Sequence, residues 1–90
     1  MDIKIIRDIS EEEIEKRGIK SWSIWEKEVS EFPWSYDEKE SFYLLEGKAH
    51  ITTESGEDVT VSAGDYVEIE AGVDCTWGIT RHVRKHYKLG

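Results

Sequence analysis

Turn signals recur every eight or nine residues through the second half of the chain, and this regularity limits the fold more than any other feature. The turns are marked by Gly47, Gly56, Gly64 and Gly72. Glycine suits chain reversals because it adopts positive φ angles without a steric penalty. Apolar and polar residues alternate between the turns, for example over residues 49–53. Short alternating strands at this spacing predict an all-β sandwich or barrel.

The N-terminal part of the chain carries a different pattern. Residues 4–6, Lys-Ile-Ile, are typical of a short strand. Ser10 is followed three residues later by Glu13, which is the spacing of a helix capping box. Gly18 is able to end a helix in the left-handed conformation. These signals predict a two-turn helix over residues 11–17.

After Gly18 the periodicity changes to two. Trp22 and Ile24 are out of phase with Trp25 and Val29, so we expect a strand with a β-bulge near Ile24. A chain of 90 residues is too short for more than one sizeable core. We therefore predict one domain over residues 1–90, with an N-terminal strand and short helix in residues 1–21 and a barrel in residues 22–90.

Charge and composition exclude several classes of partner. Asp and Glu together number 20 against 12 Lys and Arg, which gives a net charge of −8. Such a chain lacks the positive electrostatic field that attracts nucleic acids and anionic membranes. It also contains no apolar run long enough to span a bilayer. The single cysteine, Cys75, cannot form an intramolecular disulfide, and the N-terminus does not resemble a signal peptide. We expect a cytoplasmic protein.

Several motifs in order resemble the cupin family. The segments 40–47 (Glu-Ser-Phe-Tyr-Leu-Leu-Glu-Gly) and 64–72, which begins with Gly-Asp and ends with Ala-Gly, resemble parts of the two cupin motifs. The chain is more narrowly similar to the small branch named after the (S)-ureidoglycine aminohydrolase cupin domain. That branch shares Trp-x-x-Trp-Glu at 22–26, Phe-x-Trp-x-Tyr at 32–36 and Val-Arg-Lys-x-Tyr at 83–87. The resemblance implies a double-stranded β-helix, the cupin jelly-roll barrel, and the capping signals add one short N-terminal helix to this all-β fold.

The resemblance also implies a metal site, but this chain departs from the family pattern there. Cupins typically bind a divalent metal through two His and one Glu of the first motif and one His of the second. In this chain the first two positions are occupied by Pro33 and Ser35, or by Trp34 and Tyr36 if the spacer is one residue shorter, and the last is Cys75. Only Glu40 remains of the expected ligands. We predict no bound metal, with a divalent ion at Glu40 and Cys75 as the weaker alternative.

Strand parity and position in the family motifs together direct a mixed set of side chains toward the barrel interior. Apolar walls with a few convergent polar groups are typical of small-molecule sites, but a small barrel is also able to fill with its own side chains. For most of the set both interpretations stay open, whereas Phe42 is expected to be core. The candidate ligand-binding residues are Trp34, Tyr36, Glu40, Cys75, Trp77, Lys85 and Tyr87.

Glu40 and Cys75 are the candidates for catalysis. A buried carboxylate needs a partner, and Lys85 is the obvious one, so a structural Glu40–Lys85 ion pair is one reading. An unpaired Glu40 would instead be available as a general acid or base. Cys75 would be a nucleophile if a cation such as Lys85 stabilised its thiolate, but an inert buried thiol is the alternative. The three histidines, His50, His82 and His86, are expected to be surface residues without a metal.

Three functions fit these observations. The first is a metal-free cupin that binds a small organic ligand in the barrel mouth. The second is an enzyme acting on a small nitrogenous or sugar-like metabolite, similar to ureidoglycine aminohydrolase, which rests on fold analogy. The third is a structural or interaction module. A homodimer is expected in any of the three, and Trp22 and Trp25 would suit its interface because a small β-protein gains from burying edges and apolar area.

Overall fold

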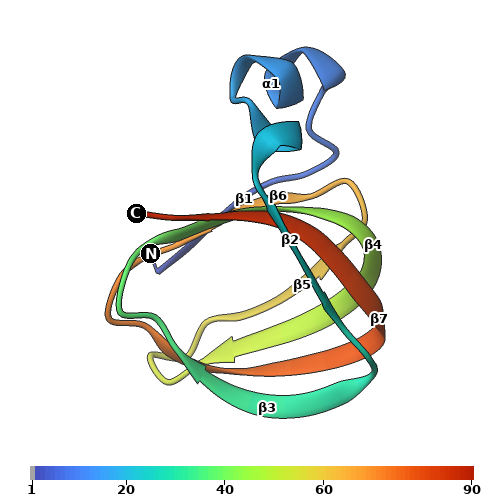
Figure 1. Cartoon of the computed structure of the whole chain (residues 1–90). Coiled ribbons are helices and arrows are strands. Elements are labelled where there is room, and N and C mark those ends of the chain that lie inside the picture. Colours follow the sequence, from blue (N-terminus) through green and yellow to red (C-terminus); the bar gives the residue numbers. More distant parts are fainter. Residues whose placement is uncertain (1) are drawn as a thin grey trace.

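The computed structural model describes residues 2–90 and is mostly antiparallel β-structure (Figure 1). One short α-helix and one 3₁₀ turn lie between the first and second strands. In chain order the elements are β1 (Ile3–Ile6), α1 (Glu11–Lys16), η1 (Ile19–Ser21), β2 (Ser23–Lys27), β3 (Ser30–Ser35), β4 (Glu40–Thr53), β5 (Asp58–Ser62), β6 (Tyr66–Ile69) and β7 (Asp74–Leu89). The predicted all-β cupin jelly roll is confirmed.

Two long strands organise the sheet. Its hydrogen-bonded order is β1-β6-β4-β7-β2, with β3 also paired to β7 and β5 also paired to β4. The first half of β7 pairs with β3, and its second half pairs with β2. In the same way β4 pairs with β6 through its first residues and with β5 through its last. Each long strand therefore contributes to two parts of the barrel wall, and both bend sharply (Figure 1).

The bend expected at residues 46–47 lies inside β4 rather than between two strands. The register between β4 and β7 shifts repeatedly from Leu44 to Ala49, as it does at β-bulges. Gly47 has φ of 99°, which favours glycine. The extra residues turn β4 around the barrel without ending it, so one strand carries both the mouth and the hairpin to β5.

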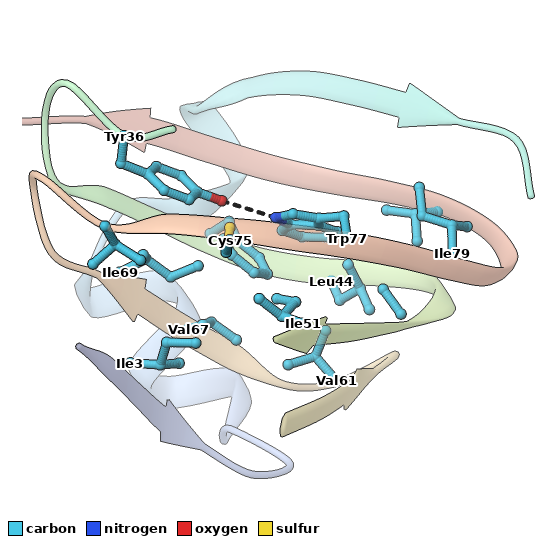
Figure 2. Packing of buried hydrophobic residues seen from close by; sticks show 14 residues of the cluster. Ile3, Tyr36, Leu44, Ile51, Val61, Val67, Ile69, Cys75, Trp77 and Ile79 are labelled. Atoms are coloured by element: carbon cyan, nitrogen blue, oxygen red, sulfur yellow. Dashed lines mark hydrogen bonds between the residues drawn. The ribbon is translucent and has the colours of Figure 1, made fainter. Parts of the chain in front are cut away.

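The barrel interior holds the main hydrophobic core (Figure 2). Alternate residues of β4, β6 and β7 supply most of it, as the period-two pattern predicts. Phe42 is completely buried, which confirms its predicted place in the core. The other residues of this cluster are Ile3, Tyr36, Leu44, Ala49, Ile51, Val61, Val67, Ile69, Val73, Cys75, Trp77, Ile79 and Val83.

The N-terminal helix forms as predicted and packs, together with η1, against Tyr66 of the sheet. The Ser10 side chain accepts a hydrogen bond from Glu13 N (3.2 Å), and Gly18 follows the helix with φ of 67°. Ile14 from α1 and Ile19 from η1 pack in a second, smaller apolar cluster with Tyr66 of β6. The first strand, which the sequence pattern groups with the helix, pairs along its length with β6 and belongs to the sheet.

The β-bulge predicted near Ile24 is wrong. Strand β2 pairs with β7 in continuous register from Ser23 to Lys27. The change of phase arises because Trp22 precedes the strand and packs against the helix-side cluster. Trp25 instead packs against the barrel core.

None of the helices formed by residues 2–90 is long and apolar enough to cross a membrane.

Candidate functional site

A cavity of about 230 Å³ opens at the mouth of the barrel. Its volume lies below the roughly 300–1,000 Å³ typical of drug-sized ligand sites. The lining comes from β2, β3, the loop that follows β3, the start of β4 and most of β7. The lining residues are Trp25, Phe32, Trp34, Tyr36, Glu40, Trp77, Lys85, Tyr87 and Leu89. The site is thus an aromatic-walled recess with one carboxylate and one amine.

Cross-strand pairing on β7 brings these residues together. Trp25 of β2 lies opposite Lys85, and Phe32 of β3 lies opposite Trp77. The rings of Phe32 and Trp77 are stacked with 6.4 Å between their centroids. The two halves of β7 therefore carry the walls of one cavity, although β2 and β3 are separate strands.

The predicted Glu40–Lys85 ion pair is present. Lys85 Nζ donates to Glu40 Oε2 over 2.6 Å, and each of the two side chains is only 7% exposed. Burial lowers the pKa of the Lys85 ammonium from its ordinary value, because the loss of hydration outweighs the stabilising charge of Glu40. Both partners also line the cavity. The pair is a polar anchor within reach of a bound molecule.

Three aromatic rings surround the Lys85 ammonium. Its Nζ lies 4.3 Å from the ring centroid of Phe42 and 4.8 Å from those of Trp25 and Trp77. Ring faces attract cations at such distances, and the attraction is stronger where water is excluded. The rings and Glu40 together favour a positive charge at this point of the barrel.

Tyr36 supplies a second polar group. Its hydroxyl oxygen accepts a hydrogen bond from Trp77 Nε1 over 3.1 Å, as Figure 2 shows. Backbone hydrogen bonds fix Tyr36 in place: its N–H donates to the carbonyl of Val73, and its carbonyl accepts from Gly72. Burial and the nearby charge of Glu40 raise the pKa of Tyr36, so the phenol keeps its proton. No side-chain hydrogen bond donated by this hydroxyl is found within residues 2–90.

Most of the sequence-predicted lining residues do meet at the mouth. Trp34, Tyr36, Glu40, Trp77, Lys85 and Tyr87 all border the cavity. Trp34 is 50% exposed, so it forms the rim and not the core. Their assignment to ligand binding remains a prediction.

Cys75 does not line the cavity, contrary to its predicted place. It is buried opposite Trp34, and its Sγ lies 3.5 Å from the Trp34 carbonyl oxygen as a weak donor. Burial raises the pKa of its thiol to about 11, and the charges of Asp74 and Glu40 add to the effect. This shift opposes the thiolate that a nucleophile or metal ligand requires.

We expect the Cys75 thiol to resist modification in the folded protein. At neutral pH the native chain should react with an aromatic disulfide reagent about a hundredfold more slowly than the unfolded chain, because the thiolate is the reactive form. The rate should rise as the pH approaches 11. Colour release recorded with and without urea measures both rates, and comparable rates at neutral pH would contradict the burial argument.

Sequence reasoning missed Trp25, Phe32 and Leu89 as lining residues. Phe32 lies two residues from Trp34, and Leu89 lies two residues from Tyr87, so side-chain alternation along each strand could have predicted both as lining residues. Trp25 was expected at a dimer interface together with Trp22. Both indoles are partly buried within their own chain, Trp22 against Tyr66 and Trp25 against Phe32 and Trp77, and their place in a dimer interface stays a prediction.

The side chains at the cupin ligand positions do not fit a metal ion. Pro33, Ser35 and Trp34 provide no imidazole, and Tyr36 remains a protonated phenol. Glu40 is held by the Lys85 ammonium, whose positive charge opposes a second cation. No cluster of three or more His, Cys, Asp and Glu residues suited to a metal is found from Asp2 to Gly90. The donor set therefore gives no support to the alternative of an ion at Glu40 and Cys75.

The histidines lie on β4 and β7, away from the cavity lining. His50 contacts Asp58, His82 lies 3.2 Å from Glu26, and His86 Nδ1 lies 3.0 Å from the Trp22 carbonyl oxygen. His50 and His82 are exposed, as predicted, whereas His86 is partly buried.

Comparisons with known proteins agree on the family. The model of the EutQ-like cupin domain matches residues 14–87. A DUF861 family protein from Thermotoga maritima, solved by crystallography, is 43% identical, with a TM-score of 0.94 over 98% of this chain and 99% of that one. No curated protein sequence matches the chain.

Two larger proteins share the same barrel. A protein of unknown function from Pseudomonas syringae, also of the DUF861 family, is 31% identical, with a TM-score of 0.67 over 74% of this chain and 29% of that one. The ethanolamine utilization protein Q of Salmonella typhimurium is 25% identical, with a TM-score of 0.66 over 97% of this chain and 68% of that one.

Proposed function

The chain belongs to the EutQ-like cupin family, and from that premise we propose that its barrel mouth binds a small organic molecule without a metal ion. The Lys85–Glu40 pair carries the proposal, because it places an amine and a carboxylate on the wall of an aromatic cavity. A purely structural ion pair has no need to border such a recess. Ligand sites are usually lined by apolar walls that carry a few polar groups.

The lining limits what the ligand is. Its small volume favours a molecule well below drug size. The Lys85–Glu40 pair is neutral as a unit, so the ligand requires no large net charge. The Tyr36 hydroxyl and the remaining N–H groups of Lys85 are donors, which suit an oxygen acceptor such as a carbonyl. The rings of Trp25, Phe32 and Trp34 suit a flat or aliphatic remainder.

Binding is testable through the tryptophans of the wall. We would titrate the protein with propionamide, propionate and N-carbamoylglycine and follow indole fluorescence and heat of binding. At least one compound should bind to wild type, and Trp34→Ala should weaken that binding about tenfold, through loss of a partly exposed aromatic contact. The fold should tolerate this change, because Trp34 is 50% exposed.

Ile24→Ala is the matched control. Ile24 is also an exposed apolar residue, at 41%, but it lies outside the cavity lining. The Ile24→Ala variant should bind the same compound with the affinity of wild type. Equal losses in the two variants, or no binding by any compound of the panel, would count against the barrel mouth as the site.

An enzymatic function similar to ureidoglycine aminohydrolase is the second candidate. Its support is the motif resemblance at residues 22–26 and 83–87 together with a buried carboxylate in the cavity wall. The homodimer also stays a prediction. Trp34 and Leu89 give the rim two half-exposed apolar side chains, which a second copy would cover.

A further inference from the structure

The Lys85 amine is unusual among the lysines of this chain. It is 5% exposed and borders the cavity, whereas Lys88 on the same strand is exposed to solvent. Glu40 accepts one of its N–H groups, and three ring faces surround the nitrogen. A buried amine beside a carboxylate, open to a small cavity, is the arrangement that lysines use to attack carbonyl groups.

We propose that Lys85 forms a protonated imine with a small aldehyde or ketone that enters the barrel mouth. This inference rests on the proposed function, because it requires the cavity to admit a small organic molecule. It adds a substrate class, carbonyl compounds, and a covalent step to that function.

The step balances with the groups present. Glu40 takes a proton from the Lys85 ammonium, and the free amine forms a bond to the carbonyl carbon, whose oxygen receives that proton. The resulting carbinolamine loses its hydroxyl as water, assisted by a second proton that passes from the nitrogen through Glu40 to the oxygen. The nitrogen lone pair then forms the C=N bond of a protonated imine. Ammonium plus carbonyl thus gives iminium plus water, and Glu40 ends as it began, a carboxylate.

The surroundings of Lys85 suit both ends of this reaction. The iminium carries the same single positive charge as the ammonium, so Glu40 and the rings of Trp25, Phe42 and Trp77 stabilise it in the same way. Burial lowers the pKa of Lys85, which increases the share of free amine compared with a lysine in water. Lys85 is only 5% exposed, which limits the access of the water that hydrolyses an imine.

Tyr36 completes the arrangement. Tyr36 lines the same cavity, and its hydroxyl oxygen accepts a hydrogen bond from Trp77 Nε1. The phenol stays protonated, so it is able to donate to the carbonyl oxygen of a bound compound. Such a hydrogen bond would orient the carbonyl and polarise it for attack.

Reductive trapping tests the inference on the wild-type protein. The full chain is incubated at neutral pH with propanal and sodium cyanoborohydride, which reduces an iminium to a stable propylamine. Peptide mapping by mass spectrometry then gives the rate of modification of each lysine. Lys85 should gain one propyl group roughly tenfold faster than Lys88, because Glu40 and three ring faces stabilise the iminium at Lys85, whereas Lys88 is exposed to solvent.

Lys88→Arg and Lys85→Arg are the matched variants, since both conserve the charge. Lys88→Arg should retain the fast modification of Lys85. Lys85→Arg should lose the fast modification, while the slow modification of exposed lysines continues. An unmodified Lys85 in a protein whose exposed lysines are propylated would overturn the inference. If one of the three titrated compounds binds to the barrel mouth in that case, the imine alone is wrong; if none of them binds, the proposed ligand site fails as well.

Discussion

Lys85→Met should destabilise the protein at neutral pH by about 3–5 kcal/mol, because the Glu40 carboxylate would remain buried without its cation. Methionine replaces the four-carbon apolar stem of lysine with a chain of similar size and omits the ammonium, so the loss reports mainly on charge. Such a change is a large part of the roughly 5–15 kcal/mol that stabilises a small domain. Urea unfolding followed by tryptophan fluorescence measures it.

The double variant Lys85→Met with Glu40→Leu is the control. It removes both charges together and should recover most of the lost stability, since apolar replacements of buried pairs are often neutral or better. A single variant as stable as wild type at neutral pH would mean that Glu40 finds another partner or reaches solvent.

The stability of the double variant distinguishes the two interpretations of the ion pair, a structural role and a role in ligand binding. If removing both charges leaves stability intact but abolishes binding of small molecules, the pair serves the site and not the fold. A loss of several kcal/mol in the double variant would instead assign it a structural role. The distinction matters because a buried ion pair is by itself weak evidence of stabilisation.

Local signals in the sequence predict much of this fold. Ser10 and Glu13 locate the helix because capping involves residues only three apart. Gly56 marks the β4–β5 hairpin, and Gly64 the turn between β5 and β6. Alternation places Ile51 and Trp77 inside, since strand side chains alternate between faces whatever the strand pairs with.

The composition of the site was only partly predictable, because it depends on long-range pairing. The Glu40–Lys85 contact joins residues 45 positions apart, and chemical complementarity pointed to it. Trp25 borders the cavity because β2 pairs with the second half of β7, a register that no local pattern specifies. Cys75 has the strand parity of Trp77 and is buried but does not border the recess, so parity identifies the interior without separating core from cavity.

The family motif was informative in another way. It identified Glu40 as a position that points inward, and the structure places Glu40 there. It did not indicate what the carboxylate contacts, because the residues at the imidazole positions differ in this chain. Lys85 holds Glu40 instead, and the chemistry of the barrel mouth follows from an ammonium and aromatic rings.

Gly47→Ala should have the other large effect on stability, because the backbone of β7 passes close to Gly47 of β4. A Cβ built at this position would overlap the His82 carbonyl and lie 2.8 Å from Val83 Cα. Both are backbone atoms, so no side-chain rotation relieves the overlap. The φ of 99° adds strain for any other residue. We expect a loss of about 3 kcal/mol or more in the free energy of unfolding.

Gly56→Ala separates the two causes. Gly56 has almost the same φ, 101°, but no atom lies within 4 Å of a Cβ added there. This variant should therefore lose only the conformational part, about 1–2 kcal/mol. The excess loss in Gly47→Ala then measures the close approach of β4 to β7, which sets the register shifts that bend β4 around the mouth. Equal losses in the two variants would show that the strands separate at little cost, and the cavity wall built on β7 would be less rigid than its packing implies.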